Sequence, residues 1–326
     1  MVLLLAATDA RAQVVAPRCA VSPSAAGNPT DVCRKAADLF AFMVPQFGVA
    51  LAGGNHVLGE GGTLGGWGKR TVTIRVSAVD GRLPANAVPI TLNRSAAVSD
   101  NFGAERVPVP MPSIDAAVGL LAGLPMGVTN VGGVDVLVGV TGLPAISSGR
   151  FRVQPHGASV ALAYGVRVGA LQESAFVPGV SASWLRRKVP TLDLDYTPAN
   201  DTLAGRNMSL TANTLRIVAS KRFVLVGIAA GVGRDEIEGT SGLGAVVNET
   251  VLGTATRATL SIPTLHEKTV RNTAFVNASF GLPIARIVAE YGRSNAGTVR
   301  QTLNTFGGRR ANELYAYGSI GVTVRF

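Results

Sequence analysis

The side chains best suited to acid–base chemistry or metal binding near neutral pH are three histidines: His56, His156 and His266. None lies beside a serine in a Gly-x-Ser-x-Gly motif, and His266-Glu267 lacks the second histidine of a zinc-binding His-Glu-x-x-His helix. Asp193, Asp195 and Asp201 could bind calcium, but their spacing differs from that of an EF-hand, which favours a solvated acidic loop. The sequence therefore predicts no enzyme activity, no metal site and no cofactor.

A second set of polar side chains consists of arginines and carboxylates at every second position of alternating apolar and polar segments. The set comprises Arg167, Arg216, Arg271, Arg286, Arg325, Asp115, Asp135 and Glu290. If the apolar faces contact lipid, these charges line an interior, because an arginine facing lipid at mid-membrane would cost about 2–4 kcal/mol. Two arrangements remain open. The arginines line a water-filled path that favours anions, or they pair with the carboxylates across a narrow, closed lumen.

Composition and charge narrow the class of protein. The 326 residues are 47% apolar and 15% charged, whereas roughly 25% of residues are charged in a typical soluble protein. Mean hydropathy is +0.31, yet the best candidate for a spanning helix, residues 116–134, contains Pro125, Asn130 and several glycines. The net charge of +10 comes mostly from isolated arginines rather than from a basic cluster with aromatics, so nucleic acid is not an expected partner.

Ten segments alternate with the period of a β-strand, and their lengths suit tilted strands that cross a bilayer. They are residues 71–78, 113–121, 133–140, 159–170, 176–186, 209–219, 223–233, 270–280, 284–292 and 318–326. The pattern predicts an all-β fold, a transmembrane antiparallel up-and-down barrel of about ten strands. Residues 254–262 also alternate, so they either extend the neighbouring strands or add a hairpin that makes twelve strands.

The lengths of the connections support the same fold. Short connections near residues 123–132, 172–174, 220–222 and 281–283 alternate with longer ones. Membrane barrels typically have short periplasmic turns and long outer loops. The sequence therefore places the four short connections at one end of the barrel and the long ones at the other.

The last strand carries apolar residues at alternate positions up to an aromatic residue: Ile320, Val322, Val324 and Phe326. This ending resembles the C-terminal signature of bacterial outer-membrane β-barrel proteins. The resemblance implies a location in the bacterial outer membrane, contact with its lipid and lipopolysaccharide, and recognition of the ending by the outer-membrane assembly machinery. It identifies neither a subfamily nor an oligomeric state.

The residues before the barrel divide into two parts. Residues 1–12 hold a short apolar run and an Ala-Arg-Ala that fits signal cleavage before Gln13, so we interpret them as the remnant of a longer signal peptide. In residues 13–67, Cys19 and Cys33 predict a disulfide, which would contribute about 3 kcal/mol for a loop of about 15 residues. Residues 68–326 then form the transmembrane barrel.

Within residues 13–67 we expect a short helix that begins near Thr30 or Asp31 and is limited by Pro45. The glycine-rich residues 53–66 predict a flexible connection to the first strand. The whole segment would be a plug in the barrel or a periplasmic extension. A plug would resemble the long-chain fatty-acid transporters, although the chain shares no motif with them.

These observations favour a passive channel or small-solute transporter with a basic lumen. The alternative is a non-conducting structural or surface-interaction barrel whose outer loops bind a ligand. An open lumen would favour the first function, and a lumen closed by ion pairs or by the N-terminal segment would favour the second.

Overall fold

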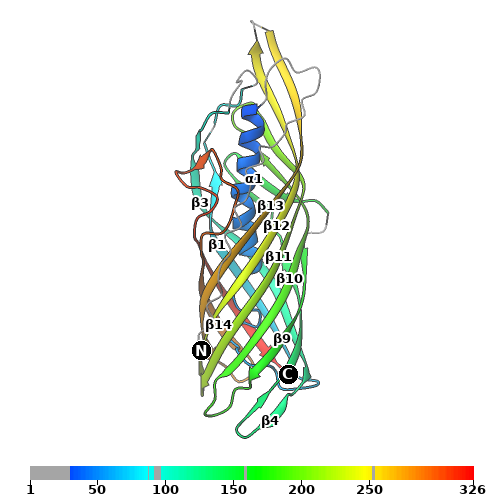
Figure 1. Cartoon of the computed structure of the whole chain (residues 1–326), viewed down its shortest axis with the longest axis vertical. Helices are drawn as coiled ribbons and strands as arrows, with labels where there is room; N and C mark the ends of the chain where they lie inside the picture. Colours follow the sequence, from blue (N-terminus) through cyan, green and yellow to red (C-terminus); the bar gives the residue numbers. More distant parts are fainter. Residues whose placement is uncertain (1–29, 87, 92–96, 158–159, 252–253) are drawn as a thin grey trace.

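Ten antiparallel strands close into a barrel, as the alternating segments predict (Figure 1). The computed structural model describes residues 30–86, 88–91, 97–157, 160–251 and 254–326. The ring consists of β1 (Arg70–Pro84), β3 (Ala104–Leu121), β6 (Val134–Gly142), β9 (Val160–Leu171), β10 (Gly179–Tyr196), β11 (Thr202–Phe223), β12 (Val226–Val251), β13 (Thr254–Gly281), β14 (Arg286–Ser294) and β16 (Tyr315–Arg325). It closes where β16 pairs with β1, from Thr71 opposite Arg325 to Val79 opposite Tyr317.

Nine of the ten predicted segments each fall on one strand of this ring. The tenth, residues 223–233, begins on β11 and continues on β12, so the turn lies at residues 224–225 rather than at the predicted 220–222. The sheet has twelve strands in all, and two of them, β7 (Ile146–Ser148) and β8 (Phe151–Pro155), branch from β10, which leaves ten in the ring. The alternation in residues 254–262 extends β13, which is 28 residues long and pairs with the 26 residues of β12. The extra residues therefore lengthen two strands at the outer end and add no hairpin to the ring.

The short connections gather at one end of the barrel, where the chain also finishes (Figure 1). One of them holds a small hairpin of β4 (Leu124–Met126) and β5 (Thr129–Val131). Two long connections meet at the opposite end, where β2 (Asn101–Phe102) pairs in parallel with β15 (Thr305–Phe306). We call this opposite end the outer end.

The only helix in the described part of the chain, α1 (Thr30–Ala52), lies inside the outer half of the barrel (Figure 1). Its length and hydropathy would allow it to cross a membrane, but the barrel wall surrounds it. Apolar side chains on all sides of the helix pack against the wall, among them Phe40, Phe42 and Phe47. A helix that is apolar all round is stable only when it is buried on every side.

The prediction that Pro45 limits the helix is wrong, because α1 continues for seven residues to Ala52. A proline inside a helix costs about 3 kcal/mol. Burial of each large apolar side chain returns about 1.5–3 kcal/mol, and the helix buries Phe47, Val49 and Leu51 beyond the proline. Packing in the barrel therefore outweighs the local preference.

Residues 1–29 lie outside the described residues. The predicted signal-peptide remnant, the cleavage before Gln13 and the Cys19–Cys33 disulfide therefore stay predictions. Cys33 itself is buried near the start of α1.

The substitution Gly48→Val should loosen the packing of α1. A Cβ atom at Gly48 would lie 2.3 Å from Cγ2 of Ile237, a fully buried residue of β12. Although valine is the better helix former, we expect a loss of about 1–3 kcal/mol of stability through overpacking. The effect is measured as the temperature at which half of the protein has lost the gel mobility of the folded barrel. Gly244→Ala is the control, because its Cβ would meet Leu260 O at an ordinary 3.5 Å. Equal midpoints for the two variants would contradict the packing described for α1.

Candidate functional site

The lumen contains residues 30–67, which we call the luminal segment. At the outer end, the Asp38 carboxylate of α1 accepts hydrogen bonds from the backbone N–H groups of Leu303 (2.8 Å) and Asn304 (3.0 Å). At the other end, Arg325 donates to the carbonyl of Leu64 at 2.7 Å. The segment therefore extends from the outer connections to the level of the short turns.

Two carboxylate–arginine groups from the barrel wall surround the C-terminal end of α1. Asp115 on β3 lies 3.0 Å from the Arg75 guanidinium of β1 and accepts a hydrogen bond from Arg187 on β10 at 2.7 Å. Arg216 on β11 lies 2.5 Å from Asp235 on β12. All five side chains are buried, so each charge depends on its partner.

The same arginines donate to the end of the helix. Arg187 contacts the carbonyls of Leu51 (3.0 Å) and Ala52 (3.2 Å). Arg216 contacts those of Gly53 (2.7 Å) and Gly54 (2.9 Å). The last carbonyls of a helix lack intrahelical donors and carry partial negative charge, so cations at this position satisfy and stabilise them.

Gly53 and Gly54 allow the chain to leave the helix at this point. Gly53 has a φ of +62°, a left-handed conformation that suits a residue just beyond a helix. A Cβ at Gly54 would lie 2.4 Å from the carboxyl carbon of Glu290. Glu290 uses this close approach to accept hydrogen bonds from Asn55 N–H and from the Asn277 amide, both at 2.8 Å.

His56 is a buried link between two strands. Its Nδ1 lies 2.9 Å from the Ser183 hydroxyl of β10, and its Nε2 lies 2.7 Å from the Thr214 hydroxyl of β11. The side chain is 5% exposed and enclosed in the lumen. The imidazole therefore positions the luminal segment through two hydroxyl contacts.

The part of the luminal segment near the short turns, which includes Glu60 and Leu64, is also held by charged residues of the barrel wall. Asp135 on β6 lies 2.6 Å from Arg167 on β9 and accepts from the backbone N–H of Leu64 at 3.2 Å. Glu60 lies 3.3 Å from Arg286 and 3.9 Å from Arg325. The glycine-rich stretch is thus an ordered part of the lumen rather than the flexible connection that we expected.

The predicted inner charges occupy three environments. Asp115, Asp135, Arg167, Arg216 and Glu290 are buried in the lumen, whereas Arg286 and Arg325 lie at the end with the short turns. Arg271 holds an outer connection instead. It donates to the carbonyls of Asn295 (2.6 Å) and Glu313 (2.9 Å), and its guanidinium lies 4.8 Å from the ring centre of Tyr315.

Sequence reasoning missed four residues of this site: Arg75, Arg187, Asp235 and Glu60. Arg75 lies at an inward position of a predicted strand, so the alternation of residues along that strand could have identified it as a luminal residue. Arg187 lies one residue beyond the predicted strand end at 186, and Asp235 lies two residues beyond the predicted end at 233. Glu60 had no periodic signal, because its surroundings are glycines that let the backbone approach the wall. A Cβ at Gly61 would lie 2.5 Å from the backbone nitrogen of Ser220.

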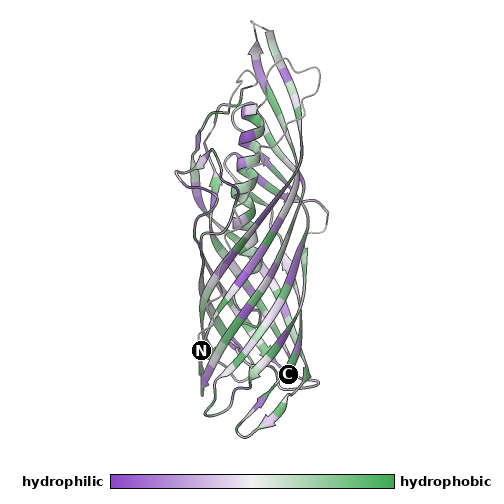
Figure 2. Ribbon diagram, in the orientation of Figure 1, coloured by the Kyte–Doolittle hydropathy of each residue, from purple (hydrophilic) through white to green (hydrophobic). Residues whose placement is uncertain are grey.

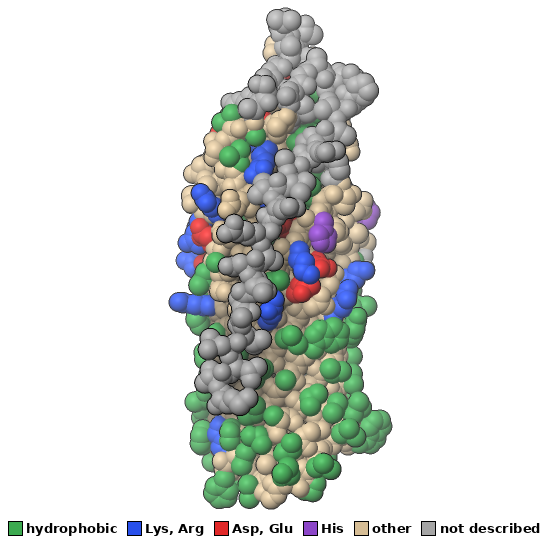
Figure 3. Space-filling model, in the orientation of Figure 1, with side chains coloured by type: hydrophobic (Ala, Val, Ile, Leu, Met, Phe, Trp, Pro, Cys, Tyr) green, Lys and Arg blue, Asp and Glu red, His purple; other side chains and the backbone are tan. Residues whose placement is uncertain are grey.

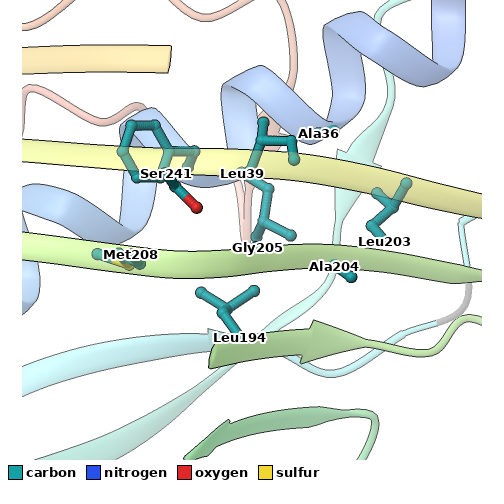
Figure 4. Close-up of a pocket in the computed structure, with 10 residues that line it drawn as sticks. Ala36, Leu39, Leu194, Leu203, Ala204, Gly205, Met208 and Ser241 are labelled. Atoms are coloured by element: carbon teal, nitrogen blue, oxygen red, sulfur yellow. The ribbon is translucent and has the colours of Figure 1, made fainter. Parts of the chain in front are cut away.

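The outer half of the lumen is tightly packed. An apolar gap between α1 and strands β10–β12 is lined by Leu39, Leu194, Leu203 and Met208 (Figure 4). Its volume is about 10 Å³, which is about the space of one water molecule. The apolar side chains of α1 therefore fill the space that an open pore would need.

The outward faces of the strands are apolar near the short turns. Ile74 on β1, Ile114 on β3 and Ile217 on β11 are exposed to 61%, 53% and 59%. Hydropathy alternates along the strands (Figure 2), and in Figure 3 hydrophobic side chains cover the lower half of the visible face while charged ones gather above. A closed barrel whose outer surface is apolar at this end, and whose interior at the same level is polar, suits a bilayer rather than water.

The chain folds as a β-barrel of the kind that spans a membrane. No protein-family model matches it, and no curated protein sequence does. Among solved structures it is similar to a loop-deletion variant of OmpT, an outer-membrane protein of Vibrio cholerae, with 10% identity over 79% of this chain and 98% of the other and a TM-score of 0.23. It is also similar to Ail of Yersinia pestis, with 9% identity, 80% and 99% coverage and a TM-score of 0.20.

The toluene transporter TodX of P. putida is a third similar structure, with 9% identity, 79% and 89% coverage and a TM-score of 0.28. Such low scores and identities transfer no site and no activity to this chain. Its function must be inferred from its own lumen.

Asp115→Asn should strongly destabilise the barrel, because it leaves the buried Arg75 and Arg187 without a counter-charge. We expect a loss of about 3–5 kcal/mol in the free energy of unfolding. Guanidinium unfolding of the protein in lipid vesicles measures it. Glu236→Gln is the matched control, since the Glu236–Lys268 pair is 39% and 46% exposed and should contribute at most about 1 kcal/mol. A similar loss of unfolding free energy in both variants would show that a buried ion pair contributes no more to stability than an exposed one.

Proposed function

We propose that residues 30–67 are a plug and that the protein is a non-conducting barrel whose outer part presents an interaction surface. This is the alternative function that the sequence left open. One observation carries it: the buried luminal arginines bond to carboxylates and to backbone carbonyls of the luminal segment, so they do not line a water-filled path. A passive channel would require this segment to leave the lumen.

The construction of the outer end supports an interaction surface. Phe42 of α1 stacks on Phe306 with ring centres 4.2 Å apart, and Phe306 lies 4.9 Å from Phe102. The helix thus ties two long connections, which carry β2 and β15, into one apolar core. A surface whose connections are held in place loses little entropy when a partner binds. A barrel that served only to anchor the chain in the membrane would not need this apolar core at the outer end, outside the part that contacts lipid.

The conductance of single barrels tests the plug. The intact protein should give no discrete current steps in a planar bilayer, and a variant lacking residues 13–67 should give steps, because the deletion removes α1 and the Glu60 contacts. Folding of both proteins is checked beforehand by heat-dependent gel mobility. Steps of equal size from both folded proteins would exclude a plug and favour the passive channel.

The terminal aromatic residue is the second test. Phe326 is 69% exposed, and its backbone pairs with Arg70, so the side chain is not needed for that pairing. If the assembly machinery reads the ending, Phe326→Asp should reduce the amount of folded barrel in the outer membrane severalfold. Phe223→Asp is the control, since Phe223 is also exposed (60%) near the same end of the barrel. Equal losses would attribute the effect to lipid contact rather than to the ending.

A further inference from the structure

A cavity opens at the end of the barrel that carries the short turns. Its volume is about 480 Å³, and three arginines line it together with Glu60: Arg222, Arg286 and Arg325. An adjoining cavity of about 370 Å³ shares Glu60, Arg222 and Arg325 and adds Glu173. Three guanidinium groups therefore surround one space large enough for a small ligand.

The three arginines are fixed by the barrel frame. Arg222 lies one residue before the end of β11, Arg286 begins β14 and Arg325 ends β16. Their side chains are 36%, 15% and 35% exposed, so part of each is accessible from the cavity. A binding site built on strand ends is better ordered than one built on a loop.

The carboxylates nearby satisfy these arginines incompletely. A single oxygen of Glu60, Oε1, lies 3.3 Å from Arg286 and 3.9 Å from Arg325. Glu173 lies 3.8 Å from the Arg222 guanidinium and already accepts from the Arg222 backbone N–H (2.7 Å) and the Ser220 hydroxyl (3.1 Å). Each guanidinium has five N–H donors, and good charge-assisted bonds are about 2.7–2.9 Å long.

We propose that this cavity binds a phosphate-type oxyanion between Arg222, Arg286 and Arg325. A tetrahedral anion offers several acceptor oxygens in different directions, so it can bond to guanidinium groups that converge from three strands. Free phosphate and the phosphate of a lipid headgroup share this chemistry. Because Glu60 belongs to the luminal segment, the bound anion and that segment compete for the same arginines.

Binding of inorganic phosphate to the intact protein in a non-ionic detergent tests the site. Phosphate should raise the melting midpoint in a saturable manner, and chloride at equal ionic strength should not. Arg222→Gln and Arg286→Gln should each weaken the apparent affinity about tenfold, the effect of one lost charge-assisted bond. Arg234→Gln, on the exposed outer face of β12, is the control and should leave the affinity unchanged.

Glu60→Gln distinguishes a specific site from general charge attraction. It removes the competing carboxylate, so phosphate affinity should rise by about threefold to tenfold. If chloride matches phosphate, or if Arg234→Gln weakens binding as much as Arg222→Gln, the proposal is overturned. A short-chain phosphatidic acid identifies the source: binding more than tenfold tighter than phosphate indicates a lipid headgroup, and equal binding indicates the free anion.

Discussion

The carbonyl groups at the end of α1 need hydrogen-bond donors, and arginines of the barrel wall provide them. Arg187 and Arg216 can lie in the lumen only because Asp115 and Asp235 neutralise them. The helix end, the arginines and the carboxylates therefore form one network, in which the loss of any member leaves a buried polar group unpaired. This network sets how deep the helix lies and where the chain turns toward His56 and Glu60.

Small residues on the inner faces make room for that arrangement. A Cβ at Gly233 would lie 2.6 Å from Arg216, and one at Gly321 would lie 2.9 Å from Leu58 of the luminal segment. Thr63 would similarly meet a Cβ at Gly169 at 2.9 Å. Part of the high glycine content thus reflects the volume that a narrow barrel must free for a filled interior. Glycine in a strand normally weakens it, and here close packing across the lumen compensates.

The strands could be predicted from the sequence because a barrel wall has lipid on one side and polar groups on the other, which imposes a period of two. The structure of the luminal segment, which fills the barrel, could not be predicted from the sequence. Pro45 and the glycines of residues 53–66 carry local signals against ordered structure, and only contacts with distant strands overrule them. The alternation of positions along the strands identified Arg167 and Arg216 as inward. No feature of the neighbouring sequence shows that Arg216 bonds to Gly53, 163 residues away. Arg271 also lies at an inward position, yet it donates hydrogen bonds to backbone carbonyls of the outer connections, at Asn295 and Glu313.

The pairing of β1 with β16 has a consequence for the order of assembly. The luminal segment precedes β1 in the chain, and α1 lies at the outer end while β1 begins at the other. To fill a barrel that had already closed, a helix bearing Phe40, Phe42 and Phe47 would have to be threaded past the ring of buried charges. Joining the first and last strands around a segment already in place avoids this passage. The seam is then the natural last step of folding, and the luminal segment is a core on which the wall is wrapped.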